Sequence, residues 1–283
     1  MRDMRPLPLA VLMGWVLLAA GSVQAAQWQF ASEVIWQDNA TNAERPQDLL
    51  SGWQWRTELQ AAGQWLLGDG HRLRATAGAN TELWPRFPGL GLFGLEIAAA
   101  WEFKPGFGPH RPVFEAGIEG GWTGARERDR SGSGGAGHVQ VRQRAGSAWL
   151  FTAGHEWRRF DARGRAFDRT AKEWSGRVEW TLAEGWTLAA TGRRRVGDVV
   201  SYSRPPRPDL VALGKPISFV DTFEQATPWI AYYFAAETRS SSLELLRSFG
   251  RSVVGLSYEY RHTLHAGPGY NNQRTALRYG RSF

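Results

Sequence analysis

Histidine is the residue type in this chain best suited to acid–base or metal chemistry, and six histidines are present. His262 and His265 stand three residues apart, and together with Glu259 they could hold a metal ion weakly. Surface histidines beside a turn are the commoner explanation of such a group. The HExxH, GxSxG and P-loop motifs do not occur in the sequence. We therefore expect the protein not to be an enzyme, to hold no metal and to use no cofactor.

Arginine and glutamate carry most of the remaining charge, and they fall on one face of segments that alternate in polarity. In residues 53–65 the odd positions hold tryptophan, leucine and small residues, whereas most even positions hold glutamine, arginine or glutamate. The same alternation recurs in 73–82, 91–103, 173–182 and 186–195. A period of two is that of a β-strand with one apolar and one polar face. The elements that position the charged groups are therefore expected to be strands.

Composition excludes several classes of protein. The chain has 283 residues, a net charge of +7, 33 Gly, 15 Trp and no Cys. The absence of cysteine excludes a disulfide scaffold and any zinc or iron–sulfur site with Cys ligands. No apolar run of about 18 residues follows residue 20, which excludes a multi-span helical membrane protein. The arginines alternate with apolar residues and form no external stripe, so we expect no nucleic-acid partner.

The N-terminus reads as a secretory signal over residues 1–25. Arg2 and Arg5 precede an apolar stretch from Leu7 to Ala20, and small residues flank a cleavage site near Ala25 and Ala26. A transmembrane anchor is the alternative, but about 14 apolar residues are few for a span. We expect an exported protein whose single domain covers residues 26–283.

Strand length and aromatic position distinguish a membrane barrel from a soluble sandwich. The alternating segments run for about 10–14 residues, near the length of a tilted membrane strand, whereas strands of globular sheets commonly have about five or six. Aromatic residues stand at both ends of the apolar face, and eight residues of tilted strand rise roughly 20 Å. A sandwich core would place tryptophan in mid-strand. The sequence predicts an all-β fold, a transmembrane antiparallel up-and-down β-barrel, with an aromatic girdle of Trp28, Trp36, Trp53, Trp65, Trp101, Trp122, Trp149, Trp157, Trp174, Trp180 and Trp186.

About twelve strands are expected, with ten or fourteen allowed by the ambiguous segment 196–248. An even count with both termini on the periplasmic side requires Tyr232 to Phe249 to be one strand. The predicted loops alternate between short and long, and the charged, Gly/Ser-rich loop 123–136 is expected to be mobile. The predicted strands are 27–37, 52–66, 71–83, 91–103, 111–122, 137–145, 148–160, 171–182, 186–199, 231–248, 251–263 and 272–283.

The last strand resembles the C-terminal assembly signal of Gram-negative outer-membrane β-barrel proteins. The chain ends on Phe283, with Leu277 and Tyr279 on the same parity, while Arg281 departs from the pattern. The resemblance implies a porin-like barrel located in the outer membrane of a Gram-negative bacterium. It also implies that outer-membrane lipids and, during assembly, the barrel-insertion machinery are partners. It identifies a class of protein and no closer family.

Two interpretations of the lumen remain open. Arginine ladders on the central strands could form a positive wall that favours anions, or arginine and glutamate could pair across strands as a structural network. The residues expected to line the lumen are Arg142, Arg144, Arg158, Arg177, Arg193, Arg195, Glu156 and Glu179.

The long extracellular segment 201–230 is the largest irregular stretch, and its apolar content indicates packing over the mouth or into the lumen, with an exposed surface loop as the alternative. We expect a pore or channel for small, including anionic, solutes. The alternative is a non-conducting structural or accessory barrel of a surface or secretion assembly for polymer or lipoprotein export.

Overall fold

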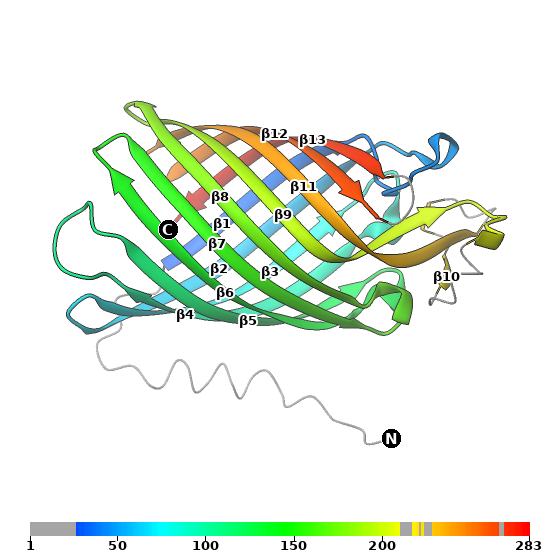
Figure 1. Cartoon of the computed structure of the whole chain (residues 1–283), viewed down its shortest axis with the longest axis horizontal. Coiled ribbons are helices and arrows are strands. Elements are labelled where there is room, and N and C mark those ends of the chain that lie inside the picture. Colours follow the sequence, from blue (N-terminus) through cyan, green and yellow to red (C-terminus); the bar gives the residue numbers. More distant parts are fainter. Residues whose placement is uncertain (1–26, 210–216, 221, 224–227, 266–268) are drawn as a thin grey trace, which may run out of the picture.

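The computed structural model describes residues 27–209, 217–220, 222–223, 228–265 and 269–283. In this part of the chain, twelve antiparallel strands form a closed barrel, since the first strand pairs with the last one and β9 pairs with β11 (Figure 1). A thirteenth, short strand pairs only with β11 and extends beyond the wall. The expected signal sequence 1–25 lies outside the described residues.

Each predicted strand corresponds to one strand of the barrel, and Trp229–Phe249 is a single strand, as expected. The long strand begins directly after Pro228, which has no N–H to give to a ladder. The strands are β1 (Gln27–Gln37), β2 (Gly52–Gly68), β3 (His71–Leu83), β4 (Leu92–Phe103), β5 (Val113–Ala125), β6 (Gly132–Ala145), β7 (Trp149–Ala162), β8 (Arg169–Ala183), β9 (Trp186–Ser203), β10 (Ile217–Val220), β11 (Trp229–Phe249), β12 (Ser252–Leu264) and β13 (Tyr270–Ser282).

The alternating sequence places its apolar face on the outside of the barrel. Trp53 is 56% exposed on β2, whereas its neighbour Gln54 is 5% exposed and lines the interior. The ladder matches like faces on adjacent strands, because Trp36 pairs with Trp53 and Trp149 pairs with Trp180. A closed barrel satisfies every strand edge internally, so this wide apolar outer surface suits a bilayer and not water. Among the described residues, no helix is both long and apolar enough to span a membrane.

The prediction for residues 123–136 was wrong in extent. β5 continues to Ala125 and β6 begins at Gly132, which leaves a short 3-10 turn (Arg128–Arg130) at the tip. Glycine explains the difference, because a β-carbon at Gly134 would lie 2.6 Å from the carbonyl oxygen of Arg159 on β7. The glycines of this segment thus permit close strand pairing instead of forming a loop.

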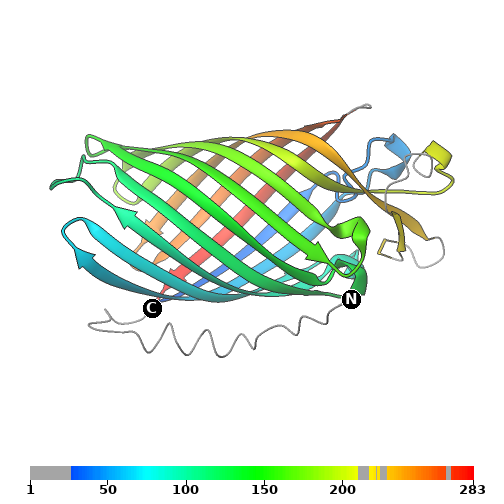
Figure 2. The ribbon, with the colours of Figure 1, turned by 60° about the horizontal axis from the view of Figure 1, so that its bottom comes forward.

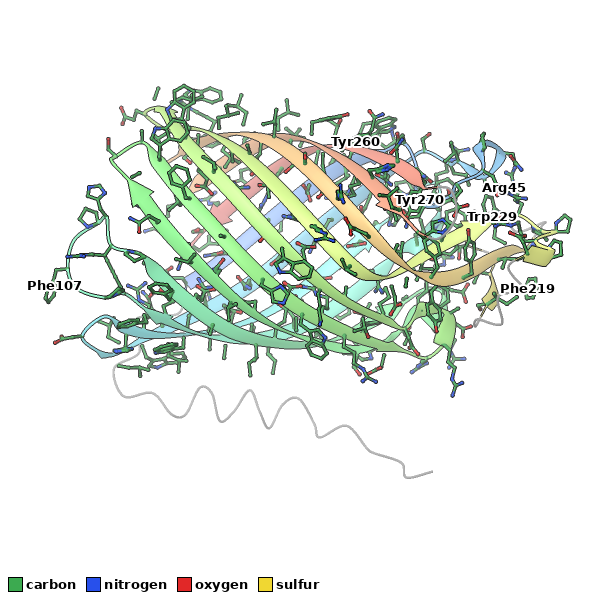
Figure 3. All side chains as sticks on the ribbon, in the orientation of Figure 1. Arg45, Phe107, Phe219, Trp229, Tyr260 and Tyr270 are labelled. Carbon is green, nitrogen blue, oxygen red and sulfur yellow. The ribbon has the colours of Figure 1, made fainter. Side chains whose placement is uncertain are left out.

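The two ends of the barrel differ in their connections. Both ends of the described chain and five connections lie at one end, here called the turn end, which includes the exposed tip residue Phe107. The other six connections between barrel strands, including the two longest, 38–51 and 204–228, lie at the opposite end, here called the loop end, together with β10 (Figure 2). Arg45 and Trp229 lie at the loop end, far from Phe107 (Figure 3). The expected alternation of short and long connections therefore holds for four of the five turn-end connections, whereas 104–112 is longer than several connections at the loop end.

Apolar residues from several loops form a cluster at the loop end, which we call the cap. It includes the 3-10 turns Pro88–Leu90 and Arg165–Phe167 and the loop after β1 with its 3-10 turn Pro46–Asp48. The cap comprises Ala40, Trp84, Phe87, Leu90, Ala166, Phe167, Tyr202, Val220, Phe223, Trp229 and Ala231.

Candidate channel lumen

Strand parity places the eight arginines and glutamates expected in the lumen on the inner face of the barrel. Arg158, Arg193 and Arg195 border the interior cavity directly. Arg142 and Arg144 share the parity of His138, whose partner Glu115 faces inward from β5. Glu156 lies two positions from Arg158 on β7 and therefore faces the same way, into the lumen. Arg177 and Glu179 face inward for the same reason, because Glu173 on the same strand, β8, borders the cavity. The inner positions also include Glu244 and Arg274, which the sequence analysis did not name. Leu243 and Leu277 face outward on the same two strands, so the alternation of faces could have placed Glu244 and Arg274 inside.

A network of charged side chains occupies the turn half of the lumen and is centred on Glu115. The Glu115 carboxylate is 4% exposed. It accepts hydrogen bonds from Gln140 at 2.7 Å and from Arg142 at 3.3 Å, and it lies 3.1 Å from His138. Arg142 also donates to Glu102 at 2.9 Å. Three adjacent strands, β4, β5 and β6, are thereby joined by charge-assisted hydrogen bonds.

A second group of ion pairs lies on the other side of the same half. Arg177 on β8 donates to Glu179 at 2.7 Å and, across β9, to Glu244 on β11 at 2.9 Å. Pairing across strands therefore accounts for much of the predicted arginine wall, in agreement with the structural-network interpretation. The pairing is incomplete, as the loop half of the lumen illustrates.

The loop half encloses a cavity of about 660 Å³. Lumen-facing glycines at positions 94, 121 and 134 help to leave this space open, because they have no side chain to fill it. More arginines than carboxylates border the cavity, and the cap residues Trp84, Leu90, Phe167 and Tyr202 border it at the loop end. A cavity with such a charged lining suits water and charged solutes better than lipid.

The buried carboxylate of Asp48 ties the cap to the end of β9. Asp48 is 0% exposed and accepts hydrogen bonds from Arg45 Nε at 2.8 Å and from Ser203 Oγ at 2.6 Å. The backbone N–H of Arg204 donates to the same carboxylate at 3.2 Å. Charged hydrogen bonds in a buried site fix the geometry of both loops.

Four described residues of segment 201–230, Tyr202, Val220, Phe223 and Trp229, pack into the cap, as the apolar content of that segment predicts, whereas Phe219 is 64% exposed. Trp229 has no exposed surface, and its ring lies 4.9 Å from that of Phe223. The guanidinium of Arg204 lies 4.9 Å from the Trp229 ring centre, in a cation–π arrangement. Residues 210–216, 221 and 224–227 lie outside the described part of the chain.

The tryptophans expected to form a girdle lie on the outer face, near the two ends of the strands. Trp36, Trp53, Trp122, Trp157 and Trp174 are nearer the loop end. Near the turn end, the ring centres of Trp149 and Trp180 lie 5.4 Å apart and the rings stack. Their role as interfacial anchors remains a prediction. The turn-end members are Trp28, Trp65, Trp101, Trp149, Trp180 and Trp186.

The residues of the expected assembly signal lie where the barrel closes. Leu277 and Tyr279 face outward from β13, which pairs with both β1 and β12. The backbone N–H of Phe283 donates to the carbonyl of Trp28, and Arg281 lies over the Phe283 ring at 5.2 Å. Recognition of this segment during assembly remains a prediction.

The histidines do not assemble into a metal centre, and within the described residues no group of three His, Cys, Asp or Glu side chains could hold a metal ion. His262 contacts the side chain of Asn271, His265 contacts Glu44, and Glu259 pairs with Arg261. His71 stacks on Trp101 and Phe103.

Comparison with known proteins identifies the fold. No protein-family model matches the chain, and no curated protein matches it in sequence. Among solved structures, an outer membrane channel from Pseudomonas putida F1 is similar with a TM-score of 0.62 and 13% identity, over 93% of this chain and 97% of that one. The fold is that of an outer-membrane β-barrel.

Two further structures align over most of their length with lower scores. The KdgM porin is 10% identical over 90% of this chain and 99% of that one, with a TM-score of 0.47. The NanC porin is 9% identical over 89% and 98%, with a TM-score of 0.49.

Proposed function

We propose that the protein is an outer-membrane channel for small solutes. The observation that supports this function is the charged cavity of about 660 Å³ inside a closed barrel whose outer face is apolar. An apolar outside faces lipid, whereas a polar inside stabilises water and solutes in transit. The similar structure from Pseudomonas putida is itself described as an outer membrane channel. No described group suggests catalysis, so we propose transport without chemistry.

The location follows from the same features. The signal expected at residues 1–25, cleaved near Ala25 and Ala26, would direct the chain out of the cytoplasm of a Gram-negative cell. The insertion machinery of the outer membrane would read the C-terminal strand ending at Phe283. The turn end would then face the periplasm and the loop end the exterior, with outer-membrane lipids around the girdle.

The lining predicts a preference for anions over cations. Arg195 has no ion pair among the described residues, and Arg193 lies 3.8 Å from its partner Glu173, beyond hydrogen-bond distance. Uncompensated positive charge in a narrow pore concentrates anions near it. This wall, and not the paired network of the turn half, would set the selectivity.

Planar-bilayer conductance tests the channel. The purified barrel should produce steps of current in salt solution, and a salt gradient should give a reversal potential of the anionic sign. A shortened variant has an Asn-Gly turn in place of residues 205–228. Its barrel should still close, because Ser203 and Ile230 are already ladder partners. It should conduct more, because it lacks most of the segment expected to pack over the mouth. Absence of current from both proteins, with folded barrels in the membrane, would refute the channel.

A non-conducting accessory barrel is the second candidate, and the cap is the observation that favours it. The cap lies at the loop end and contains buried aromatic residues, and the Asp48 hydrogen bonds tie it to β9. If the native barrel produces no current and the shortened variant conducts, the cap blocks the native lumen. A partner or a solute would then have to open it. Export of polymers or lipoproteins would then be the function to examine.

A further inference from the structure

The charges that border the cavity differ between its two facing walls. On strands β2–β5 the carboxylates of Glu82, Glu96 and Glu119 border the cavity with Arg56. Strands β7–β13 contribute mainly arginines. That second wall comprises Arg158, Arg193, Arg195, Arg261 and Arg274, with Glu173 and Glu259 among them.

The order of strands places these walls opposite each other. The carboxylates lie on β3, β4 and β5, and the arginines are centred on β9, β12 and β13, roughly half a turn around the barrel. Four further charged residues border the cavity. Arg159 pairs with Asp161, and Asp198 accepts a hydrogen bond from the Thr170 N–H. Arg130 donates to the carbonyl of Gly89 and Arg169 lies over the Phe160 ring, and because neither contact neutralises a charge, both arginines add to the positive excess.

The acidic wall is only partly neutralised. Glu119 pairs with Arg158 at 2.9 Å. Among the described residues, no ion pair and no side-chain hydrogen bond joins Glu82 or Glu96 to a partner. The residues that pair with Glu96 on the adjacent strands are Gly78 and Gly121. Because these glycines have no side chains, the Glu96 carboxylate faces the open cavity.

The basic wall keeps unused hydrogen-bond donors. Arg261 and Arg274 share one carboxylate, Glu259, at 2.7 and 3.6 Å. In the described structure Arg195 borders the cavity without an ion pair, and the half-exposed Arg193 lies 3.8 Å from Glu173, beyond hydrogen-bond distance. A guanidinium with free N–H groups is a donor for a carboxylate or sulfonate.

Opposed charges on facing walls produce a field directed across the pore. A simple anion is attracted by one wall and repelled by the other, and a simple cation experiences the reverse. A molecule with both charges can satisfy both walls at once when it lies across the lumen. A volume of about 660 Å³ is ample for such a molecule together with water.

We propose that this cavity selects small zwitterionic solutes, whose acid group faces Arg193 and Arg195 and whose ammonium group faces Glu82 and Glu96. The proposal rests on the channel function and names its class of substrate. Anions would follow zwitterions in preference, and cations would come last, because the arginines outnumber the carboxylates.

Two matched pairs of solutes test the preference in liposomes that contain the protein, with equal potassium chloride on both sides. Taurine is zwitterionic, and isethionate is the anion that has a hydroxyl in place of its ammonium group. Glycine betaine is zwitterionic, and choline is the cation that has a hydroxymethyl group in place of its carboxylate. We expect taurine to enter faster than isethionate and betaine faster than choline, each by about two- to fivefold, since a partly exposed charge pair has a modest effect.

Single substitutions should separate the two walls. Glu96→Gln should abolish the advantage of taurine over isethionate, and Arg193→Gln should abolish the advantage of betaine over choline. Glu237→Gln removes a carboxylate that pairs with Arg194 and Arg239 outside the cavity lining, and it should change neither ratio.

Arabinose, which is neutral, reports on the channel itself. If arabinose enters and neither zwitterion is preferred, or if both lumen variants leave the ratios unchanged, the proposal is overturned while the channel stands. If neither arabinose nor any charged probe enters, even through the shortened variant, the channel function fails and this proposal fails with it.

Discussion

Trp229 is the residue whose removal should open the cap most directly. Its side chain has no exposed surface and packs against Phe223 and under the guanidinium of Arg204. Its indole Nε1 has no hydrogen-bond partner among the described residues, so Trp229→Ala removes packing without stranding a polar partner. The substitution should loosen the cap and leave the barrel wall intact.

The magnitude follows from burial. Replacing a fully buried tryptophan with alanine costs about 3–5 kcal/mol. If that cost falls on local opening of the cap, the open population rises by roughly 10²- to 10⁴-fold. The twelve-strand ladder does not depend on this side chain, so global unfolding of the barrel should change little.

Because the chain contains no cysteine, a single introduced cysteine is the only thiol that can react with a labelling reagent. A single probe, Ala166→Cys, places a thiol in the cap at a site that is 2% exposed. Its reaction with a membrane-impermeant maleimide measures the open population. We expect Trp229→Ala to accelerate labelling by roughly 10²-fold or more, and to raise conductance.

Trp157→Ala is the matched control, because that tryptophan lies on the outer face and not in the cap. It should leave labelling of the probe unchanged. If Trp229→Ala changes labelling by less than about threefold while the barrel remains folded, the cap does not depend on this packing and the reasoning from burial is refuted.

Three further outcomes are expected. Glu115→Ala should destabilise the barrel in urea by about 1–3 kcal/mol, because Gln140, Arg142 and His138 lose the buried acceptor that they share. The more exposed Glu119→Ala should cost about 0–1 kcal/mol, and equal losses would contradict the central place of Glu115 in the network. Arg193→Glu combined with Arg195→Glu should weaken or reverse the anionic reversal potential, and an unchanged potential would rule out the arginine wall as its source. Phe283→Ala should lower the fraction of folded barrel in cell envelopes, measured by migration of unheated samples in gels, without altering the conductance of the molecules that do fold.

Most of the architecture could be predicted from local sequence. Side chains on a strand alternate with a period of two, so the face of each residue is set by its own parity and needs no tertiary information. Strand length and the aromatic ends of each apolar face then distinguished a membrane barrel from a sandwich. The one clear error, residues 123–136, arose because glycine is typical of loops and is also suited to close strand contacts.

The functional site was determined only by the tertiary structure. Parity placed Arg177 and Arg195 in the lumen, but it could not show that Arg177 pairs with Glu244, 67 residues away, whereas Arg195 has no ion partner in the described structure. Those contacts depend on register and on closure of the barrel, which bring distant strands together. The cap likewise joins loops through Asp48 and Trp229, whose partners lie far away in the sequence. Sequence alone thus determined which side of the wall each residue faces, whereas the folded barrel decided which charges neutralise each other and which remain for a solute.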